Sequence, residues 1–242
     1  MNEPILQLRG VSKRFTLHHQ GSLVLPVLDN VHFDVYPGEC LVLDGASGMG
    51  KSTLLKLIYA NYRVSTGAIH FSPNHQTSMD LTQASPRDLI KVRREQIGYV
   101  SQFLRVIPRV SALDLVAEPL LSQVGQDINK LEQAREQAGR WLTLLRIPER
   151  LWGLAPATFS GGEQQRVNIA RSMIKPRALL LLDEPTASLD AINTQTVIAL
   201  IKQAMAAGTA AVGIFHDPAV GRQLATRRLD ITAFRSIQCA AQ

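Results

Sequence analysis

Apolar and polar residues alternate along the first third of the chain, in the segments ILQLRGVSKRF (5–15), VLDNVHFDVYP (27–37) and ECLVLDG (39–45). The side chains of a strand point alternately to its two faces, so a period of two is typical of strands with one buried face. The first two segments predict a small N-terminal antiparallel sheet. The third predicts the strand that leads into a glycine-rich loop.

The apolar period lengthens to 3.6 between about residues 104 and 175, which predicts helices. In the segment 129–147, one stripe of the expected helix would carry Leu131, Ala134, Ala138, Leu142 and Leu145. Asn129, followed three residues later by Glu132, predicts the capped start of this helix.

Strands and helices alternate in the last third. An apolar strand at 179–182 ends on two acids, a helix follows, and TAAVGIFHD (209–217) predicts a second strand. This alternation is typical of an α/β fold with a parallel sheet. The sequence therefore predicts one domain, 1–242, whose α/β core carries an inserted helical subdomain at about 104–175. The C-terminal segment 225–238 predicts a short pair of strands.

Composition excludes several classes of protein. The chain has 242 residues and is 45% hydrophobic, enough for a substantial core. No apolar run approaches the roughly 18 residues that a membrane-spanning helix needs, and the N-terminus lacks the pattern of a secretory leader. We therefore expect a cytoplasmic protein that does not insert into a membrane. Cys40 and Cys239 have no metal-ligand spacing and are expected to be reduced thiols.

The net charge of +6 does not by itself choose a partner. The densest basic stretch, PRDLIKVRRE (86–95), has a helical pattern and no aromatic residue that could stack on a base. A solvated helix face is the favoured interpretation. We expect no nucleic-acid partner.

The segment CLVLDGASGMGKSTLLKLIYA (40–60) contains the spacing G-x-x-x-x-G-K-S of a phosphate-binding P-loop. Glycines leave the backbone N–H groups open to an anion, and the positive end of the following helix faces it. Lysine can reach the outer phosphates and serine can bind Mg²⁺. The predicted nucleotide-binding residues are Gly45, Ala46, Ser47, Gly48, Met49, Gly50, Lys51, Ser52 and Thr53.

Asp183 and Glu184 end the strand LLLL and form a second chemical motif. A carboxylate at the tip of a strand beside a P-loop can hold the Mg²⁺ shell, and its neighbour can reach an attacking water. We therefore assign Asp183 to the metal and Glu184 to the general base.

A second anion-binding motif, FSGGEQQR (159–166), lies more than a hundred residues after the P-loop. Ser160 would open a helix, and Gly161 and Gly162 leave backbone N–H groups bare. Such a chain either binds two phosphates or shares one nucleotide between two copies of itself.

These motifs, in this order, resemble those of ATP-binding cassette ATPases, in which FSGGE is the signature motif. The resemblance spans nearly the full chain and implies an ABC-type P-loop ATPase with a RecA-like core that uses ATP and Mg²⁺. It implies that Phe15 stacks on adenine, that Gln102 is a Mg²⁺ ligand that senses a partner, and that His216 contacts the γ-phosphate. It further implies that the signature residues Ser160, Gly161, Gly162 and Glu163 and the D-loop residues Ser188, Leu189 and Asp190 meet the opposite subunit of an ATP-dependent homodimer or cassette heterodimer.

Three positions depart from the common pattern of that family. Asp44 places an acid directly before the P-loop, which would weaken nucleotide binding unless its side chain points to the far side of the strand. Phe159 replaces the usual Leu, and Glu163 stands where many members have Gln. The catalytic groups are retained, which favours a competent ATPase.

Within that family, the chain resembles the cassette proteins of the bacterial carbon–phosphorus lyase system. The similarity rests on YVSQFLRVIPRVSALDLVAEPLL, PATFSGGEQQRVNIARSMI and LLLLDEPTASLDA. It implies a soluble, phosphonate-processing complex of carbon–phosphorus lyase subunits, associated with formation of ribose 1-methylphosphonate 5-triphosphate. The alternative is the energising subunit of a membrane transporter. A small-molecule kinase or a nucleic-acid ATPase is a third, less favoured class, because the signature motif disfavours a kinase.

Overall fold

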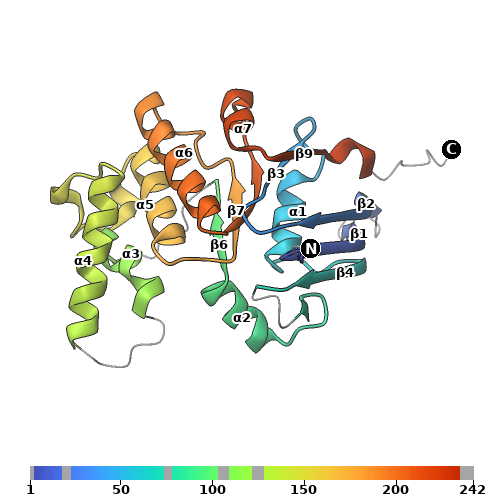
Figure 1. Ribbon diagram of the computed structural model, residues 1–242, viewed down its shortest axis with the longest axis horizontal. Helices are drawn as coiled ribbons and strands as arrows, with labels where there is room; N and C mark the ends of the chain where they lie inside the picture. Colours follow the sequence, from blue (N-terminus) through green and yellow to red (C-terminus); the bar gives the residue numbers. More distant parts are fainter. Residues whose placement is uncertain (1–2, 18–22, 74–77, 103–108, 122–127, 235–242) are drawn as a thin grey trace.

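The described part of the protein contains two β-sheets, and helices pack around one of them (Figure 1). The structure is a computed structural model, and it describes residues 3–17, 23–73, 78–102, 109–121 and 128–234. The first sheet is antiparallel, with the order β2-β1-β4-β5, and consists of β1 (Leu6–Leu17), β2 (Leu23–Val35), β4 (Thr66–Phe71) and β5 (Met79–Asp80). The second is parallel, with the order β6-β7-β8-β3-β9, and consists of β3 (Cys40–Asp44), β6 (Ile97–Val100), β7 (Leu179–Asp183), β8 (Ala210–Ile214) and β9 (Arg227–Asp230).

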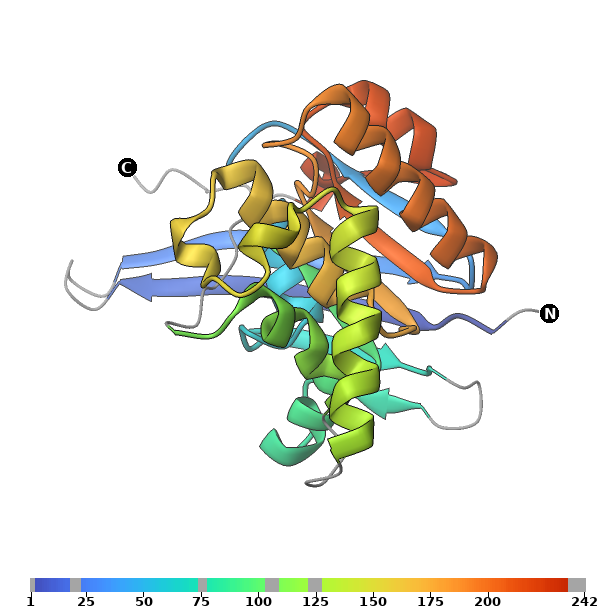
Figure 2. The same cartoon turned by 90° about the vertical axis from the view of Figure 1, so that its left-hand side faces the viewer.

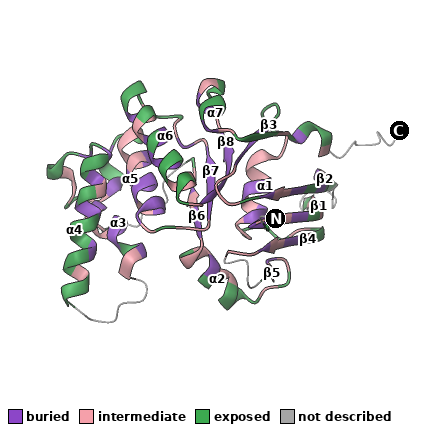
Figure 3. Ribbon diagram, viewed as in Figure 1, coloured by how far each residue is buried: buried purple, intermediate pink, exposed green. Residues whose placement is uncertain are grey.

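The central strands of the parallel sheet are buried on both faces, so they read as continuous apolar runs. Alternate side chains enter different cores. On β7, Leu180 and Leu182 join the core beneath the helical region, whereas Leu179 and Leu181 join the core shared with the antiparallel sheet. Figure 3 shows β7 and β8 buried. The parallel sheet therefore lies between two hydrophobic cores, and packing on both of its faces holds the ends of its strands in place.

Seven α-helices lie in the described part of the chain. Helix α1 (Lys51–Ile58) buries Leu54, Leu55, Leu57 and Ile58 in the core between the two sheets. Helices α3 (Ala112–Leu121), α4 (Ile128–Leu144) and α5 (Gly161–Met173) gather at one end of the molecule, in chain order between the neighbouring strands β6 and β7 (Figures 1 and 2). The others are α2 (Pro86–Glu95), α6 (Ala191–Ala206) and α7 (Pro218–Leu224).

Two ion pairs link the three helices that follow β6. Arg135 on α4 contacts Asp114 on α3 at 2.7 Å, and Arg171 on α5 contacts Glu118 on α3 at 3.1 Å. The predicted stripe of α4 faces inward, with Ala134, Ala138 and Leu142 buried. The buried apolar stripe packs α4 into the core that also contains buried residues of α3 and α5, and the ion pairs lie at the surface of this packing.

The predicted elements agree with the structure except at two ends. Helix α4 begins at Ile128, so Asn129 lies inside its first turn and not at the predicted cap. Of the predicted C-terminal strand pair, the described residues contain one strand, β9, and residues 235–238 lie outside the described residues. After β9, Asp230 accepts a hydrogen bond from the Thr232 backbone N–H and turns the chain into a short 3₁₀ helix, Ile231–Phe234.

Basic helix α2 spans the predicted residues 86–95 and buries only Val92, as expected of a solvated face. Its start is capped by Ser85, which accepts a hydrogen bond from the Asp88 N–H. In the described part of the chain, no helix combines the length and apolar character needed to cross a membrane.

Candidate active site

The P-loop joins β3 to α1, and its glycines have backbone angles that other residues avoid. Gly45, Gly48 and Gly50 have φ values of 130°, 78° and 90°. A Cβ on Gly50 would also lie 2.9 Å from Cγ1 of Val27 on β2. Glycine is therefore required at Gly50 by both conformation and space.

Helix α1 begins as an open anion-binding end. Its N-cap Gly50 provides no side-chain hydrogen bond, and no acid lies in its first turn. The Lys51 ammonium folds back over the loop and donates to the carbonyl oxygens of Gly45 (2.5 Å) and Ala46 (2.8 Å). Backbone N–H groups, the helix dipole and one lysine thus converge on the loop, as a phosphate site requires.

Asp183 lies at the end of β7 and is 6% exposed. Its Oδ1 accepts a hydrogen bond from the Ser52 hydroxyl at 2.9 Å, and its Oδ2 accepts one from the Tyr99 hydroxyl at 3.1 Å. The structure thus brings the P-loop serine and the predicted metal acid together. Tyr99 is a site residue that the sequence analysis missed, because only the pairing of β6 with β7 places it there.

Glu184 follows Asp183 directly but has a different backbone conformation, with φ of 52°. Its N–H donates to the Ile214 carbonyl oxygen at 3.0 Å, and its Oε2 accepts a hydrogen bond from Gln102 Nε2 at 3.3 Å. A side chain with positive φ is held there by its surroundings, and such strained residues cluster at functional sites. The turn points Glu184 away from the buried position of Asp183.

Two side chains of α5 hold the segment before Gln102. The Ser101 carbonyl oxygen accepts hydrogen bonds from Asn168 Nδ2 (2.8 Å) and Gln165 Nε2 (3.4 Å). Gln165 Nε2 also donates to the Pro185 carbonyl oxygen at 3.2 Å. Helix α5 is thus bound both to the segment ending at Gln102 and to the residue after Glu184.

Residues of the P-loop line two cavities. One, of about 410 Å³, is lined by Ser47, Lys51, Glu184 and His216, with the exposed His216 just beyond β8. The other, of about 600 Å³, is lined by Ser52, Gln102 and Asp183. The predicted base and histidine therefore share one cavity with the P-loop lysine, and the predicted metal ligands share the other.

The signature motif forms the start of α5. Ser160 is the N-cap and makes a capping box with Glu163, whose Oε2 accepts hydrogen bonds from the Ser160 hydroxyl (2.7 Å) and N–H (2.8 Å). These bonds, the hydroxyl's first, hold the pKa of Glu163 below its usual value. Gly162 packs so closely on the D-loop that a Cβ would lie 2.8 Å from the Ser188 carbonyl oxygen. Ser160 and Gly161 are exposed or open to solvent.

The second predicted phosphate cradle, at the start of α5, lies outside the two cavities described above. The residues from Ser160 to Glu163 line neither of the cavities that meet the P-loop. Asp190, exposed at the N-cap of α6, accepts a hydrogen bond from the Asn193 N–H at 2.8 Å, which lowers its pKa. The approach of Gly162 to Ser188 thus brings the signature motif and the D-loop together, outside both cavities that the P-loop lines.

Phe15 lies on β1, and its ring meets the Tyr62 ring edge-on with centroids 5.4 Å apart. The Lys13 ammonium lies 4.6 Å from the Phe15 ring centroid. Phe15 lines neither P-loop cavity, but it pairs with Leu25 two residues before Val27, which contacts Gly50. The aromatic pair thus joins β1 to the segment between α1 and β4, which contains Tyr62.

The sequence suggested that Asp44 either points away from the nucleotide site or places an uncompensated charge beside it. The structure shows neither arrangement. The Asp44 side chain does not avoid the site, because it lines the cavity that contains Lys51 and His216. It is not left uncompensated either, because Arg228 on β9 makes two hydrogen bonds to its carboxylate. Sequence reasoning missed Arg228, which lies 184 residues away and meets Asp44 only because β9 pairs with β3.

A parallel sheet with a P-loop after one strand and paired acids after another is typical of a P-loop nucleotide-binding protein, and the signature motif at the start of α5 is typical of the cassette type. A comparison with known families places the chain plainly: it matches the family model described as ABC transporter over residues 28–187, and it belongs to that family.

Curated relatives agree with this family. The chain is 36% identical over 225 residues to the lipoprotein-releasing system ATP-binding protein LolD of Shewanella sp. (strain MR-4), covering 93% of this chain and 92% of that protein. It is 34% identical over 228 residues to the macrolide export ATP-binding/permease protein MacB of Sodalis glossinidius, covering 92% of this chain but 32% of that protein.

Solved structures show the same fold. The chain is similar to the dimeric structure of a post-hydrolysis state of the ATP-binding cassette MJ0796 bound to ADP and Pi, with a TM-score of 0.80 and 29% identity over 90% of each chain. A second structure, the dimeric structure of MJ0796, a bacterial ABC transporter cassette, matches with the same TM-score of 0.80 and 30% identity. The predicted α/β cassette fold is therefore confirmed.

Proposed function

We propose that this protein binds and hydrolyses Mg-ATP between two head-to-tail cassettes and uses the closure of that dimer to drive a partner protein. The observation that carries the proposal is the contact between Ser52 of the P-loop and Asp183 of β7, beside Glu184. Through this contact, the P-loop, the predicted metal ligand Asp183 and the predicted base Glu184 lie together at the C-terminal ends of β3 and β7.

In this proposal the loop N–H groups and Lys51 bind the phosphates of ATP. Lys51 exchanges the loop carbonyl oxygens that it contacts for phosphate oxygens, which are stronger partners for an ammonium group. Phe15 stacks on adenine, and Tyr62 supports its ring edge-on.

Ser52, Gln102 and Asp183 would hold Mg²⁺. All three offer oxygen ligands, which Mg²⁺ prefers, and they line one cavity. Mg²⁺ commonly uses only one or two carboxylates together with phosphates and water, so a single buried acid fits the site. The ion would neutralise charge on the phosphates when bound.

Glu184 acts as the general base that polarises water, and His216 contacts the γ-phosphate. Glu184 and His216 line the same cavity as Lys51. The hydrogen bond from Gln102 to Glu184 links the base to the predicted partner sensor. A shift of Gln102 on partner binding would therefore reorient the base, which gives the partner a route to control hydrolysis.

A second cassette completes the site. Ser160, Gly161, Gly162 and Glu163 lie apart from the P-loop cavities of their own chain, with Asp190 nearby on the D-loop side. A two-fold dimer would place this surface over the γ-phosphate bound by the other chain. Support comes from the similarity to MJ0796, which is dimeric in both structures.

The partner is a membrane transporter component in the interpretation that the relatives favour. LolD belongs to a lipoprotein-releasing system, and this chain covers 92% of it. MacB is an ATP-binding/permease protein of which this chain covers about a third, 32%. By analogy, this chain corresponds to the ATP-binding part of a transporter, which would meet its permease at the cytoplasmic face.

A soluble carbon–phosphorus lyase complex is the second candidate partner. The observation that favours it is the sequence around Gln102 and the signature motif, which resembles phosphonate-utilisation cassettes; residues 103–108 of that stretch lie outside the described residues. In that role, ATP would drive a complex associated with formation of ribose 1-methylphosphonate 5-triphosphate. The chain offers no additional residue set for that transfer.

The two partners are separated by trapping the closed dimer in cells. A tagged Glu184→Gln chain, expressed in cells grown on a phosphonate as sole phosphorus source, should retain ATP and its partner. A stoichiometric permease in the membrane fraction, with normal phosphonate growth of a Lys51→Ala strain, establishes the transporter role. Soluble lyase subunits, with loss of growth on phosphonate but not on phosphate, establish the other. Recovery of the same proteins with Lys51→Ala bait would contradict ATP-dependent coupling.

A further inference from the structure

Asp44 and Arg228 form a charge pair at the rim of the nucleotide cavity. Asp44 Oδ1 lies 2.6 Å from Arg228 Nη2, and Asp44 Oδ2 lies 2.7 Å from Arg228 Nε, so the guanidinium binds the carboxylate with two parallel hydrogen bonds. Both residues line the cavity that also contains Lys51, Glu184 and His216.

The pair exists because of the strand order. Strand β9 is an edge strand parallel to β3, and Arg228 is in register with Val42, two residues before Asp44 on the same face. The arginine side chain therefore reaches forward along β3 to the residue that precedes the P-loop. The side chains are 44% and 33% exposed, and ion pairs with this exposure contribute little to folding stability.

A carboxylate at this position opposes the function that we propose for the loop. Asp44 is covalently bound to Gly45, the first P-loop residue, so an unpaired charge on it would repel the phosphates of ATP over a short distance. Pairing with Arg228 cancels that charge. The same pairing restrains Arg228, which would otherwise add a cation beside Lys51.

We propose that Arg228 is a positioning residue of the nucleotide site: it neutralises Asp44, and the balance of this pair sets the affinity for the anionic nucleotide. This inference rests on the proposed function, because it presumes that the P-loop binds a nucleoside triphosphate. It adds to that site a residue of β9 that belongs to none of the motifs identified in the sequence.

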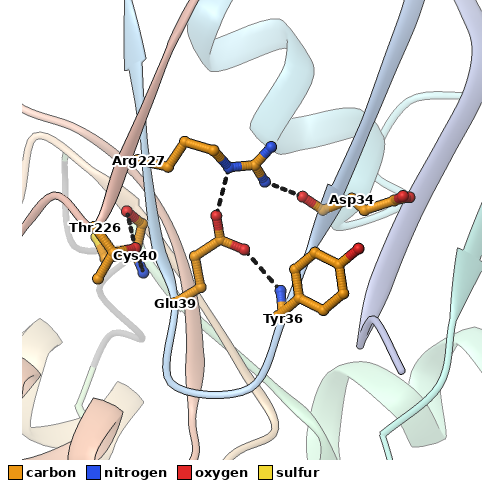
Figure 4. A network of polar contacts seen from close by, with 6 residues as sticks. All are labelled: Asp34, Tyr36, Glu39, Cys40, Thr226 and Arg227. Atoms are coloured by element: carbon orange, nitrogen blue, oxygen red, sulfur yellow. Dashed lines mark hydrogen bonds and ion pairs between the residues drawn. The ribbon is translucent and has the colours of Figure 1, made fainter. Parts of the chain in front are cut away.

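Arg227 provides a matched control within the same strand (Figure 4). It precedes Arg228, is also 44% exposed, and also forms an ion pair, with Glu39 at 2.6 Å. It donates to the Asp34 carbonyl oxygen on β2 and lies away from the nucleotide cavity. Replacing either arginine by Gln lowers the net charge by the same amount. A difference in ATP affinity between the two variants would therefore come from the position of Arg228 beside the nucleotide cavity.

The experiment measures the Kd for Mg-ATP by calorimetric titration at low and high salt, in a Glu184→Gln background that prevents turnover. Arg228→Gln should weaken binding about fivefold or more at low salt, and less at high salt because ions screen the repulsion. Asp44→Asn should bind ATP at least as tightly as the parent. The double variant should return to within about twofold of the parent, and Arg227→Gln should stay within about twofold.

Equal effects of Arg228→Gln and Arg227→Gln would overturn the inference, and so would weaker binding by Asp44→Asn. Thermal melting of each variant checks folding, and Asp44→Asn keeps the test valid if Arg228→Gln does not fold. If the parent binds no ATP, the proposed function fails. If the parent binds ATP and Lys51→Ala abolishes binding while Arg228→Gln changes nothing, only the inference about Arg228 fails.

Discussion

At the scale of single residues, two consecutive acids occupy different environments. Asp183 is buried and accepts hydrogen bonds from Ser52 and Tyr99, whereas Glu184 turns out of the strand with a positive φ and faces a cavity. The first arrangement suits a fixed metal ligand, and the second suits a base that must reach water. The change of backbone conformation between these neighbours thus places the two carboxylates in different environments, as the two proposed roles require.

Glu184→Gln should leave Mg-ATP binding largely intact and lower turnover by about 10² or more, because glutamine keeps the shape and the hydrogen bond to Gln102 but cannot take a proton. Steady-state ATPase assays and nucleotide titration measure the two effects. Lys51→Ala is the contrasting variant, because it should impair binding itself. Unchanged turnover by Glu184→Gln would show that another group is the base.

Cys40 should be unreactive in the folded protein. Its side chain is fully buried in β3, and burial, followed by the charge of Glu39, raises its pKa to about 12. At pH 8 only about one thiol in 10⁴ is then a thiolate. In a Cys239→Ser variant, a disulfide reagent should label no thiol in the native protein and one per chain in guanidinium chloride. Rapid native labelling would contradict the burial.

Residue roles could be predicted where the motif is local. The P-loop residues from Gly45 to Ser52 are contiguous, so their spacing alone indicates a phosphate site. The pairs Asp44–Arg228 and Tyr99–Asp183 could not be predicted, because their members are far apart in sequence and meet only through the strand order β6-β7-β8-β3-β9.

At the scale of elements, the start of α5 is fitted against the loop before α6. Gly162 lies against the Ser188 carbonyl oxygen, while a Cβ on the adjacent Gly161 would meet nothing within 4 Å. The signature motif and the D-loop are therefore one packed unit, and a shift of either moves the other.

Gly162→Ala should destabilise the protein by about 1–3 kcal/mol, because the new methyl group must displace backbone. Gly161→Ala should stay within about 0.5 kcal/mol of the parent or be slightly more stable, since alanine favours a helix over glycine. Urea unfolding of the two variants measures this difference. Equal stabilities would mean that the D-loop does not pack on α5 as described.

Helices and strands with a strong apolar periodicity could be predicted, whereas the residues at which elements begin and end could not. Helix α2 and strand β7 follow from contiguous patterns, since Pro86 opens α2 and four leucines make β7. Within the described residues, the chain after β9 forms a 3₁₀ helix and not a strand, because Asp230 starts a turn by a single side-chain hydrogen bond. Periodicity cannot distinguish such a turn from a second short strand.

At the scale of the whole molecule, the two predicted phosphate-binding motifs lie on different elements, the β3–α1 loop and the start of α5. The strand ends of the parallel sheet carry the P-loop, Asp183 and Glu184, while the start of α5 presents Ser160 elsewhere. The cassette fold was predictable because its motifs recur in a fixed order. The partner could not be predicted from the sequence. A transporter subunit and a soluble-complex subunit would use the same catalytic groups and differ only in the surfaces that contact another chain.

The central claim is that each ATP site is built from two chains, and mixed dimers test it most directly. A Lys51→Ala chain is combined with a differently tagged Ser160→Arg chain, and dimers carrying both tags are isolated. Each variant alone should be inactive, because every site in its homodimer is defective. The mixed dimer has one site with an intact P-loop and an intact signature motif, so it should regain about half the parent turnover. No activity in mixed dimers that carry both tags, or parent-level activity of Ser160→Arg alone, would contradict a shared site.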